Sequence, residues 1–320
     1  MKKIFSSVLR TSISLALIVI LLYIMRDRYG EIISTLKGAN ISMLMFALSV
    51  FFLALCVASF RFELIVKAQE NISITFFEAV SLTFIGYFFN NFLPTSIGGD
   101  VVKAYHLSKK AKEKTGSFTA VFVDRAIGLL TMIFMAFIAL FFVETKSIDT
   151  RVKYMIYSIT AASFLFMLFM MNRAIARRFS IFLLFLRPIE EKLRKLYTAI
   201  NRYRHHKILM FHSLLISVAS QLLFFLSIGI IASSIGSHIS VMQILLRMPI
   251  ISVMGLLPSI NGLGLREGST VLLFGPLIGK ENAFAVSILW LLSLFVISLL
   301  GGLVYALSPQ FKVKLKEIEA

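Results

Sequence analysis

Residues 88–105, FFNNFLPTSIGGDVVKAY, concentrate helix breakers and polar side chains inside an otherwise apolar part of the chain. Glycine allows backbone N–H groups to approach a ligand closely, and a helix that begins just after the glycines would present N–H groups to an anion. Thr95 and Ser96 add hydroxyl groups, and Asp100 and Lys103 add charges. This combination predicts a site for an anionic group such as a phosphate.

A second stretch, LLPSINGLG at residues 256–264, resembles FLPTSIGG at residues 92–99. Pro94 in the first stretch and Pro258 in the second are each followed, at the same spacing, by a glycine. We expect the two stretches to meet and to hold one anionic group between them. The competing interpretation is that these residues only form tight turns and pack two broken helices.

A charged pair, Asp124 and Arg125, lies within the apolar run TAVFVDRAIGLLTMIF. Charges inside an apolar span are costly and usually face the protein interior or a polar cavity. Because a guanidinium group binds phosphate through two parallel hydrogen bonds, Arg125 is the first candidate for a phosphate ligand. The alternative is that Arg125 forms a structural ion pair with Asp100 or Glu267.

Other charged residues follow the same pairing of the two stretches. Lys103 and Glu267 both lie nine residues after their prolines and are expected to form an ion pair. Glu78 and Arg247 are rough counterparts near the start of each stretch, where their charged ends are expected to reach the membrane surface. The candidate substrate-binding residues are Asn91, Thr95, Ser96, Gly98, Gly99, Asp100, Lys103, Asp124, Arg125, Asn261, Gly262, Gly264, Arg266 and Glu267.

The elements that position these residues must be membrane helices. Of the 320 residues, 58% are hydrophobic and only 15% are charged, whereas a soluble domain of this length needs far more polar surface. A helix of roughly 20 apolar residues spans a bilayer. The sequence predicts an all-α polytopic membrane protein, formed by a single domain over residues 1–320, with six spanning helices at about 8–25, 41–60, 117–143, 152–171, 208–235 and 282–307.

The two remaining apolar segments, about 74–108 and 240–280, are each interrupted by proline and glycine. Cytoplasmic loops collect Lys and Arg. If both segments enter and leave on one side, 23 of the 33 basic residues, Arg61 among them, face the cytoplasm and 7 face outside. If only the first segment crossed fully, 9 would lie inside and 21 outside, although two crossing segments would partly restore the balance. Two re-entrant segments are therefore predicted, with both chain ends on the cytoplasmic side of the cell membrane.

This topology relates one half of the chain to the other by inversion. Residues of about 41–143 form a first repeat of helix, re-entrant segment and helix, and residues of about 208–307 form a second repeat turned over. Such repeats with broken helices near the midplane are typical of secondary transporters. Residues of about 172–207 form a basic, amphipathic cytoplasmic linker, which is expected to lie on anionic lipid or to dock a partner.

Three pieces of the sequence together resemble a known family: FFNNFLPTSIGGDVVKAYHLSK (88–109), VDRAIGL (123–129) and LPSINGLGLREGS (257–269). With the helix layout they are similar to the lysylphosphatidylglycerol synthetase transmembrane, or flippase-like, family, whose domain also forms the membrane half of the multiple peptide resistance lipid flippase. The resemblance covers nearly the whole chain and implies translocation of a lipid between leaflets. It leaves the lipid headgroup open: anionic, aminoacylated or polyprenyl-phosphate lipids all fit.

Other functional classes are weighed against this flippase or scramblase. The net charge of +17 indicates contact with anionic lipid headgroups, not with nucleic acid. A membrane glycosyltransferase is disfavoured because the chain has no Asp-x-Asp pair, and an enzymatic role is not expected. A non-catalytic partner of a lipid- or glycan-modifying enzyme remains the main alternative. No cofactor is predicted, because GPLIGK (275–280) is too short for a phosphate-binding loop, and the histidines and the single cysteine lack metal-ligand spacing.

Overall fold

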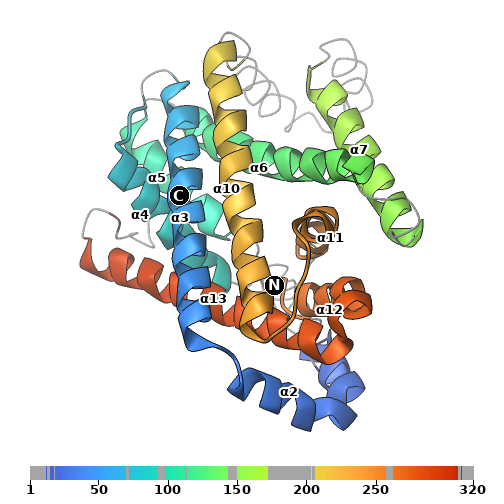
Figure 1. Cartoon of the computed structure of the whole chain (residues 1–320). Helices are drawn as coiled ribbons and strands as arrows, with labels where there is room; N and C mark the ends of the chain where they lie inside the picture. The colour runs from blue at the N-terminus through green and yellow to red at the C-terminus, as the bar shows by residue number, and fades with distance from the viewer. Residues whose placement is uncertain are drawn as a thin grey trace.

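The computed structural model describes residues 12, 15–17, 19–69, 72–92, 98–111, 114–142, 150–171, 203, 206–256, 262–308 and 311. Helices are the only regular elements in that part of the chain (Figure 1). They are η1 (Arg26–Arg28), α2 (Tyr29–Lys37), α3 (Ile41–Lys67), α4 (Phe76–Phe92), α5 (Gly98–Lys110), α6 (Lys114–Phe142), α7 (Thr150–Met171), α10 (Lys207–Ser234), α11 (Val241–Met254), α12 (Leu265–Ile278) and α13 (Lys280–Leu307).

Four of the described helices are long and apolar enough to cross a membrane: α3, α6 from Thr115, α10 and α13. They coincide with four of the six expected spans. The helix expected at 152–171 is present as α7, but it is not one of these four. In the span expected at about 8–25, residues 12, 15–17 and 19–25 are described and are helical. The linker expected at 172–207 lies outside the described residues except for residues 203, 206 and 207. The chain is therefore an integral membrane protein built from helices.

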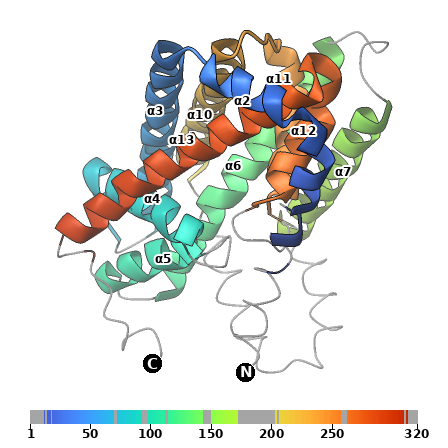
Figure 2. The same ribbon diagram turned by 90° about the horizontal axis from the view of Figure 1, so that it is seen from below.

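The helices α3 and α10 lie side by side on one face of the molecule, in front in Figure 1 and along the upper edge in Figure 2. Their ends are joined where the Asn40 N–H group donates to the carbonyl oxygen of Ser234 over 2.8 Å. The Asn40 side chain also accepts from the Met43 N–H group, which caps the start of α3. Helix α6 packs on both α3 and α10, α13 packs on α10, and α7 packs on α6.

Each interrupted segment consists of two short helices. In the first, α4 has 17 residues and α5 has 13, and in the second, α11 and α12 have 14 each. All are shorter than the roughly 20 residues that a spanning helix needs. Residues 93–97, between α4 and α5, and residues 257–261, in the middle of the connection between α11 and α12, lie outside the described residues. The expectation of two broken helical segments is confirmed in the ranges on either side of each gap.

The packing of the two halves follows one pattern. In the first half α4 contacts α5 and α5 contacts α6, and in the second half α11 contacts α12 and α12 contacts α13. Between the halves α3 packs on α10, α4 on α13, and α11 on α6. Figure 2 shows α13 running diagonally across the molecule, with α4 near one end and α12 and α2 near the other. If α3, α4, α5 and α6 are exchanged with α10, α11, α12 and α13, each of these helix contacts, within and between the halves, becomes another of them or itself.

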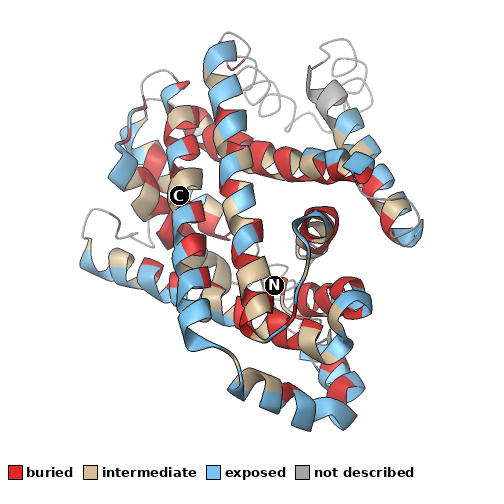
Figure 3. Ribbon diagram, in the orientation of Figure 1, coloured by how far each residue is buried: buried red, intermediate tan, exposed pale blue. Residues whose placement is uncertain are grey.

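Glycines allow the short helices to approach their neighbours closely. A side chain on Gly99 of α5 would collide with the carbonyl group of Gly86 in α4, and one on Gly301 of α13 would collide with the carbonyl group of Phe84. Buried apolar side chains fill the interior. The outer surfaces of α3 and α10 carry many exposed residues (Figure 3), and many of these residues are large and apolar. Phe46, for example, is 59% exposed, which suits a surface that faces lipid.

Candidate functional site

The first broken segment is held together by an asparagine at the end of α4. The Asn90 side-chain oxygen accepts a hydrogen bond of 2.8 Å from the Gly99 N–H group in the first turn of α5. This bond satisfies one of the N–H groups that a helix start leaves unpaired. Asn90 was not among the candidates, although its place directly before the proline-glycine break is a signal for such a cap.

Arg125 of α6 forms an ion pair with Asp100 in the first turn of α5. The structure thus confirms one of the two ion pairs considered for Arg125. The two side chains are 32% and 19% exposed, so the pair is open on one side. Asp100 lies at the positive end of the α5 dipole, where negative charge is favoured.

Asp124 has a different partner, on α3. The Arg61 Nε group donates to an Asp124 carboxylate oxygen over 2.8 Å, and its Nη1 group donates to the Ser217 hydroxyl of α10 over 2.8 Å. Both side chains of the ion pair are nearly buried, at 8% and 12% exposure. Gly128 leaves space for the guanidinium group, because a side chain there would approach it to 3.2 Å.

The expectation that Arg61 belongs to a cytoplasmic segment is wrong. The helix α3 continues to Lys67, seven residues beyond the expected boundary at residue 60, so Arg61 lies within the helix bundle. Glu63 is also nearly buried and forms an ion pair of 2.7 Å with Lys67, four residues later on the same helix. Both ion pairs that involve α6 lie near Tyr87 of α4. Their four charged groups are all close enough to interact electrostatically with the Tyr87 phenol.

The second broken segment has an ion pair of its own at the start of α12. An Arg266 Nη2 group donates to Glu267 over 2.7 Å, and the other carboxylate oxygen of Glu267 accepts from the Gly264 N–H group over 2.6 Å. Gly264 has a φ of +84°, which favours glycine. The Arg266 guanidinium lies 5.0 Å from the Trp290 ring centre. Glu267 therefore caps the start of α12, and Arg266 links α12 to Trp290 of α13. Both charged residues are 6% exposed.

The expected ion pair between Lys103 and Glu267 is wrong. Glu267 pairs with Arg266, while the Lys103 amino group lies 5.0 Å from the centre of the Phe62 ring. The expectation for Arg247 is also wrong, because it is 3% exposed and its Nε group donates to the Leu273 carbonyl oxygen over 2.8 Å. Nearby partners in the bundle satisfy these charges, and the spacing of residues along the sequence does not indicate such partners.

The remaining candidates divide into packed and undescribed residues. The Asn91 amide donates to the Ser298 hydroxyl and to the Leu294 carbonyl, so it ties α4 to α13. Gly262 has a φ of +76° and packs on Gly255. Gly98 and Gly99 form the buried first turn of α5. Three candidates, Thr95, Ser96 and Asn261, lie outside the described residues.

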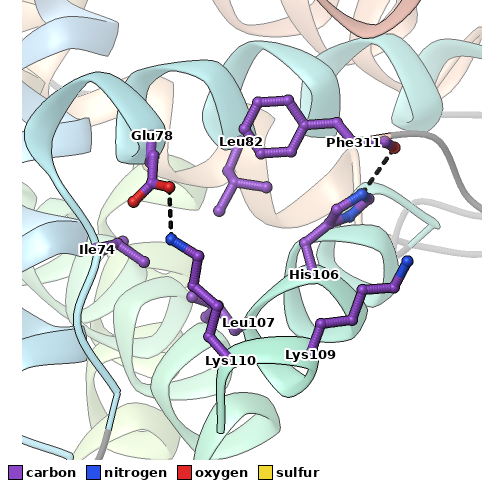
Figure 4. Close-up of a pocket in the computed structure, with 8 residues that line it drawn as sticks. All are labelled: Ile74, Glu78, Leu82, His106, Leu107, Lys109, Lys110 and Phe311. Atoms are coloured by element: carbon purple, nitrogen blue, oxygen red, sulfur yellow. Dashed lines mark hydrogen bonds and ion pairs between the residues drawn. The ribbon is translucent and has the colours of Figure 1, made fainter. Parts of the chain in front are cut away.

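A cavity of about 90 Å³ lies between α4 and the C-terminal half of α5 (Figure 4). Glu78 of α4 and Lys110 of α5 form an ion pair of 2.5 Å at its edge. Burial raises the pKa of Glu78, but the hydrogen bonds from Lys110 and Thr75 and the charge of Lys110 outweigh it and lower the pKa below its ordinary value of 4.5. The two ring nitrogens of His106 lie 2.8 Å and 2.7 Å from the carbonyl oxygens of Val102 and Phe311.

Among the residues that the structure describes, no three His, Cys, Asp or Glu side chains gather where they could hold a metal ion.

The candidates that form ion pairs fall into two charged groups. One is Arg125 with Asp100, beside Asp124 with Arg61, and the other is Arg266 with Glu267. Of these three ion pairs, the one between Arg125 and Asp100 is the most exposed.

Comparison with known proteins supports the resemblance of the sequence motifs. Searches of curated proteins and of solved structures found no significant match. The model of one family, described as the lysylphosphatidylglycerol synthase TM region, matches residues 9–302. Because this match extends over both halves of the bundle and both broken segments, the chain belongs to the family of the lysylphosphatidylglycerol synthase TM region.

Proposed function

We propose that this protein moves an anionic lipid between the leaflets of the cell membrane, as a flippase or scramblase. The observation that carries the proposal is the partly exposed ion pair of Arg125 with Asp100, which lies at the start of a short helix inside a bundle of apolar helices. Membership of a family linked to a lipid synthase supports a role in membrane lipid chemistry. The proposal assigns the protein no catalytic reaction.

In this proposal the two halves form an inverted repeat. The helix pairs α4–α5, α5–α6 and α4–α13 correspond to α11–α12, α12–α13 and α11–α6 when one half is exchanged for the other, and each half has one broken segment between two long helices. Both features are typical of transporters in which a substrate site lies near the bilayer midplane. The broken segments re-enter from opposite sides, as the distribution of Lys and Arg favours.

Arg125 is the proposed phosphate ligand. Its guanidinium group offers two parallel N–H donors to phosphate oxygens, and the start of α5 adds the positive end of a helix dipole. The Asn90 cap fixes the start of α5 relative to α4. The ion pair of Arg266 with Glu267 holds the second broken segment in place, while the acyl chains of the lipid stay in the bilayer.

The test is lipid movement by the purified protein in liposomes that contain a fluorescent phosphatidylglycerol. A membrane-impermeant reductant bleaches only the outer leaflet, so continued bleaching reports movement from the inner leaflet. We expect wild-type protein to move the lipid and Arg125→Ala to abolish movement while it still folds. Arg26→Ala is the matched control, because Arg26 forms an exposed ion pair with Asp27.

Two outcomes would contradict the proposal. Normal lipid movement by well-folded Arg125→Ala protein would remove Arg125 as the ligand. A lack of movement by wild-type protein, with lipid modification only when a separate enzyme is added, would instead identify a non-catalytic partner of a lipid- or glycan-modifying enzyme.

A further inference from the structure

We infer that Asp100 is an exchangeable counter-ion, which a lipid phosphate displaces from Arg125 and which then binds a proton. This inference rests on the proposed function and deepens it: an anionic lipid and one proton would cross the membrane together. The substrate class is a lipid whose phosphate carries a negative charge, whatever the rest of its headgroup.

Exposure distinguishes this ion pair from the two other ion pairs of the candidate site. The side chains of Arg61 and Asp124 are 8% and 12% exposed, and those of Arg266 and Glu267 are 8% and 7% exposed. Arg125 and Asp100, in contrast, are 32% and 19% exposed. An incoming anion can therefore reach the guanidinium group of Arg125 without disrupting a packed core, whereas the other two arginines are enclosed by their partners.

Asp100 occupies the position that suits a phosphate. It is negatively charged, it contacts the guanidinium group, and it lies in the first turn of α5, where the helix dipole favours an anion. A carboxylate and a phosphate both accept the paired N–H donors of an arginine. The two groups therefore compete for the same cation.

The groups around Asp100 make its displacement costly. Arg125 faces it from α6, Tyr87 lies near it on α4, and Asp124, the neighbour of Arg125 on α6, points towards α3 instead. Arg61 neutralises Asp124, and Lys103 on α5 itself lies over the Phe62 ring. A displaced Asp100 carboxylate would have lost its cation inside an apolar bundle, where an unpaired charge is costly.

Proton binding removes this cost. A proton from water binds an oxygen of Asp100, while a phosphate oxygen replaces that carboxylate at the Arg125 N–H groups. The site then holds one positive guanidinium, one negative phosphate and a neutral carboxylic acid, so its net charge is the same as before. On release, the phosphate leaves, the proton returns to water and the ion pair of Arg125 with Asp100 forms again.

The first experiment measures binding of a short-chain phosphatidylglycerol to the purified protein in detergent by titration calorimetry. The phosphodiester stays ionised throughout the pH range of the test. Because binding of the lipid takes up one proton in this scheme, we expect wild-type protein to bind roughly tenfold more tightly at about pH 5 than at about pH 8. Asp100→Asn should bind tightly at both values, and Asp100→Glu should retain the pH dependence.

Asp27→Asn is the matched control, since Asp27 is 84% exposed in its ion pair with Arg26, and it should behave as the wild type. Wild-type binding that does not depend on pH, or Asp100→Asn binding that is no tighter than wild type at high pH, would overturn the inference. If Asp100→Asn does not fold, the wild type and Asp100→Glu decide the question through their pH dependence.

The second experiment adds a pH-sensitive dye inside the liposomes. We expect inward movement of phosphatidylglycerol by wild-type protein to acidify the interior, and Asp100→Asn to move the lipid without acidification. Lipid movement without acidification by the wild type would overturn the inference and leave the proposed function standing. A wild type that binds the lipid with the expected pH dependence but moves none would instead overturn the proposed function.

Discussion

The adjacent residues Asp124 and Arg125 do not pair with each other. Neighbouring side chains on a helix point about 100° apart, so each of them reaches a different helix. Asp124 pairs with Arg61 of α3, and Arg125 pairs with Asp100 of α5. One turn of α6 thus joins three helices, with a buried ion pair on one side and an accessible one on the other.

The buried ion pair is predicted to stabilise the fold. Arg61→Ala should lower the free energy of unfolding by about 3–5 kcal/mol, because it leaves the Asp124 carboxylate buried without a cation. The measurement is the thermal unfolding midpoint of the purified protein in detergent, with Arg26→Ala as the exposed control. Asp124→Asn added to Arg61→Ala should recover part of the loss, and an unchanged midpoint for Arg61→Ala would contradict the prediction.

At the residue scale, sequence reasoning identified charges more reliably than their partners. Arg125 and Asp100 were both candidates, and their ion pair was one of the stated alternatives. The partner of Asp124 was missed because the expected helix ended with the apolar run, at residue 60. The helix continues because Arg61 and Glu63 find partners at the helix surface, which hydropathy cannot show. Lys103 was assigned the wrong partner, because position relative to a proline does not fix side-chain packing.

Among the elements, the long helices were predictable and the details of the short ones were not. An apolar run of bilayer length has few alternatives to a helix, so α3, α6, α10 and α13 appear within a few residues of the expected spans, apart from the longer end of α3. The proline and glycine clusters located both breaks. The short helix α2 was not foreseen, since its nine residues give a weak periodic signal.

The close packing of α4 on α5 is predicted to depend on a glycine. Gly99→Ala should force the two helices apart, because its methyl group would collide with the Gly86 carbonyl. We expect a loss of about 1–3 kcal/mol in the free energy of unfolding, together with reduced lipid movement. Gly268→Ala in α12 is the matched control, because no heavy atom lies within 4 Å of the added carbon. Equal thermal midpoints for the two variants would contradict the prediction.

Across the whole molecule, the positions of the helix ends decide which loops share a side. The hydrogen bond between Asn40 and Ser234 places the start of α3 beside the end of α10. The hydrogen bond of the Tyr203 hydroxyl to the Ile65 carbonyl likewise places the residues before α10 near the end of α3. Helices α3 and α10 are therefore antiparallel, and the balance of Lys and Arg predicts which end is cytoplasmic.

This orientation can be tested with single cysteines in intact cells. Cys56 is the only cysteine, so Cys56→Ala gives a background without thiols. Lys37→Cys and His238→Cys, at the end of α2 and just before α11, should react with a membrane-impermeant maleimide from outside. Lys67→Cys and His206→Cys, at the end of α3 and the start of α10, should react only after the membrane is permeabilised. A permeant maleimide that labels all four variants controls for exposure. The reverse pattern would invert the orientation, whereas labelling of Lys37→Cys and His238→Cys from opposite sides would contradict the antiparallel arrangement of α3 and α10.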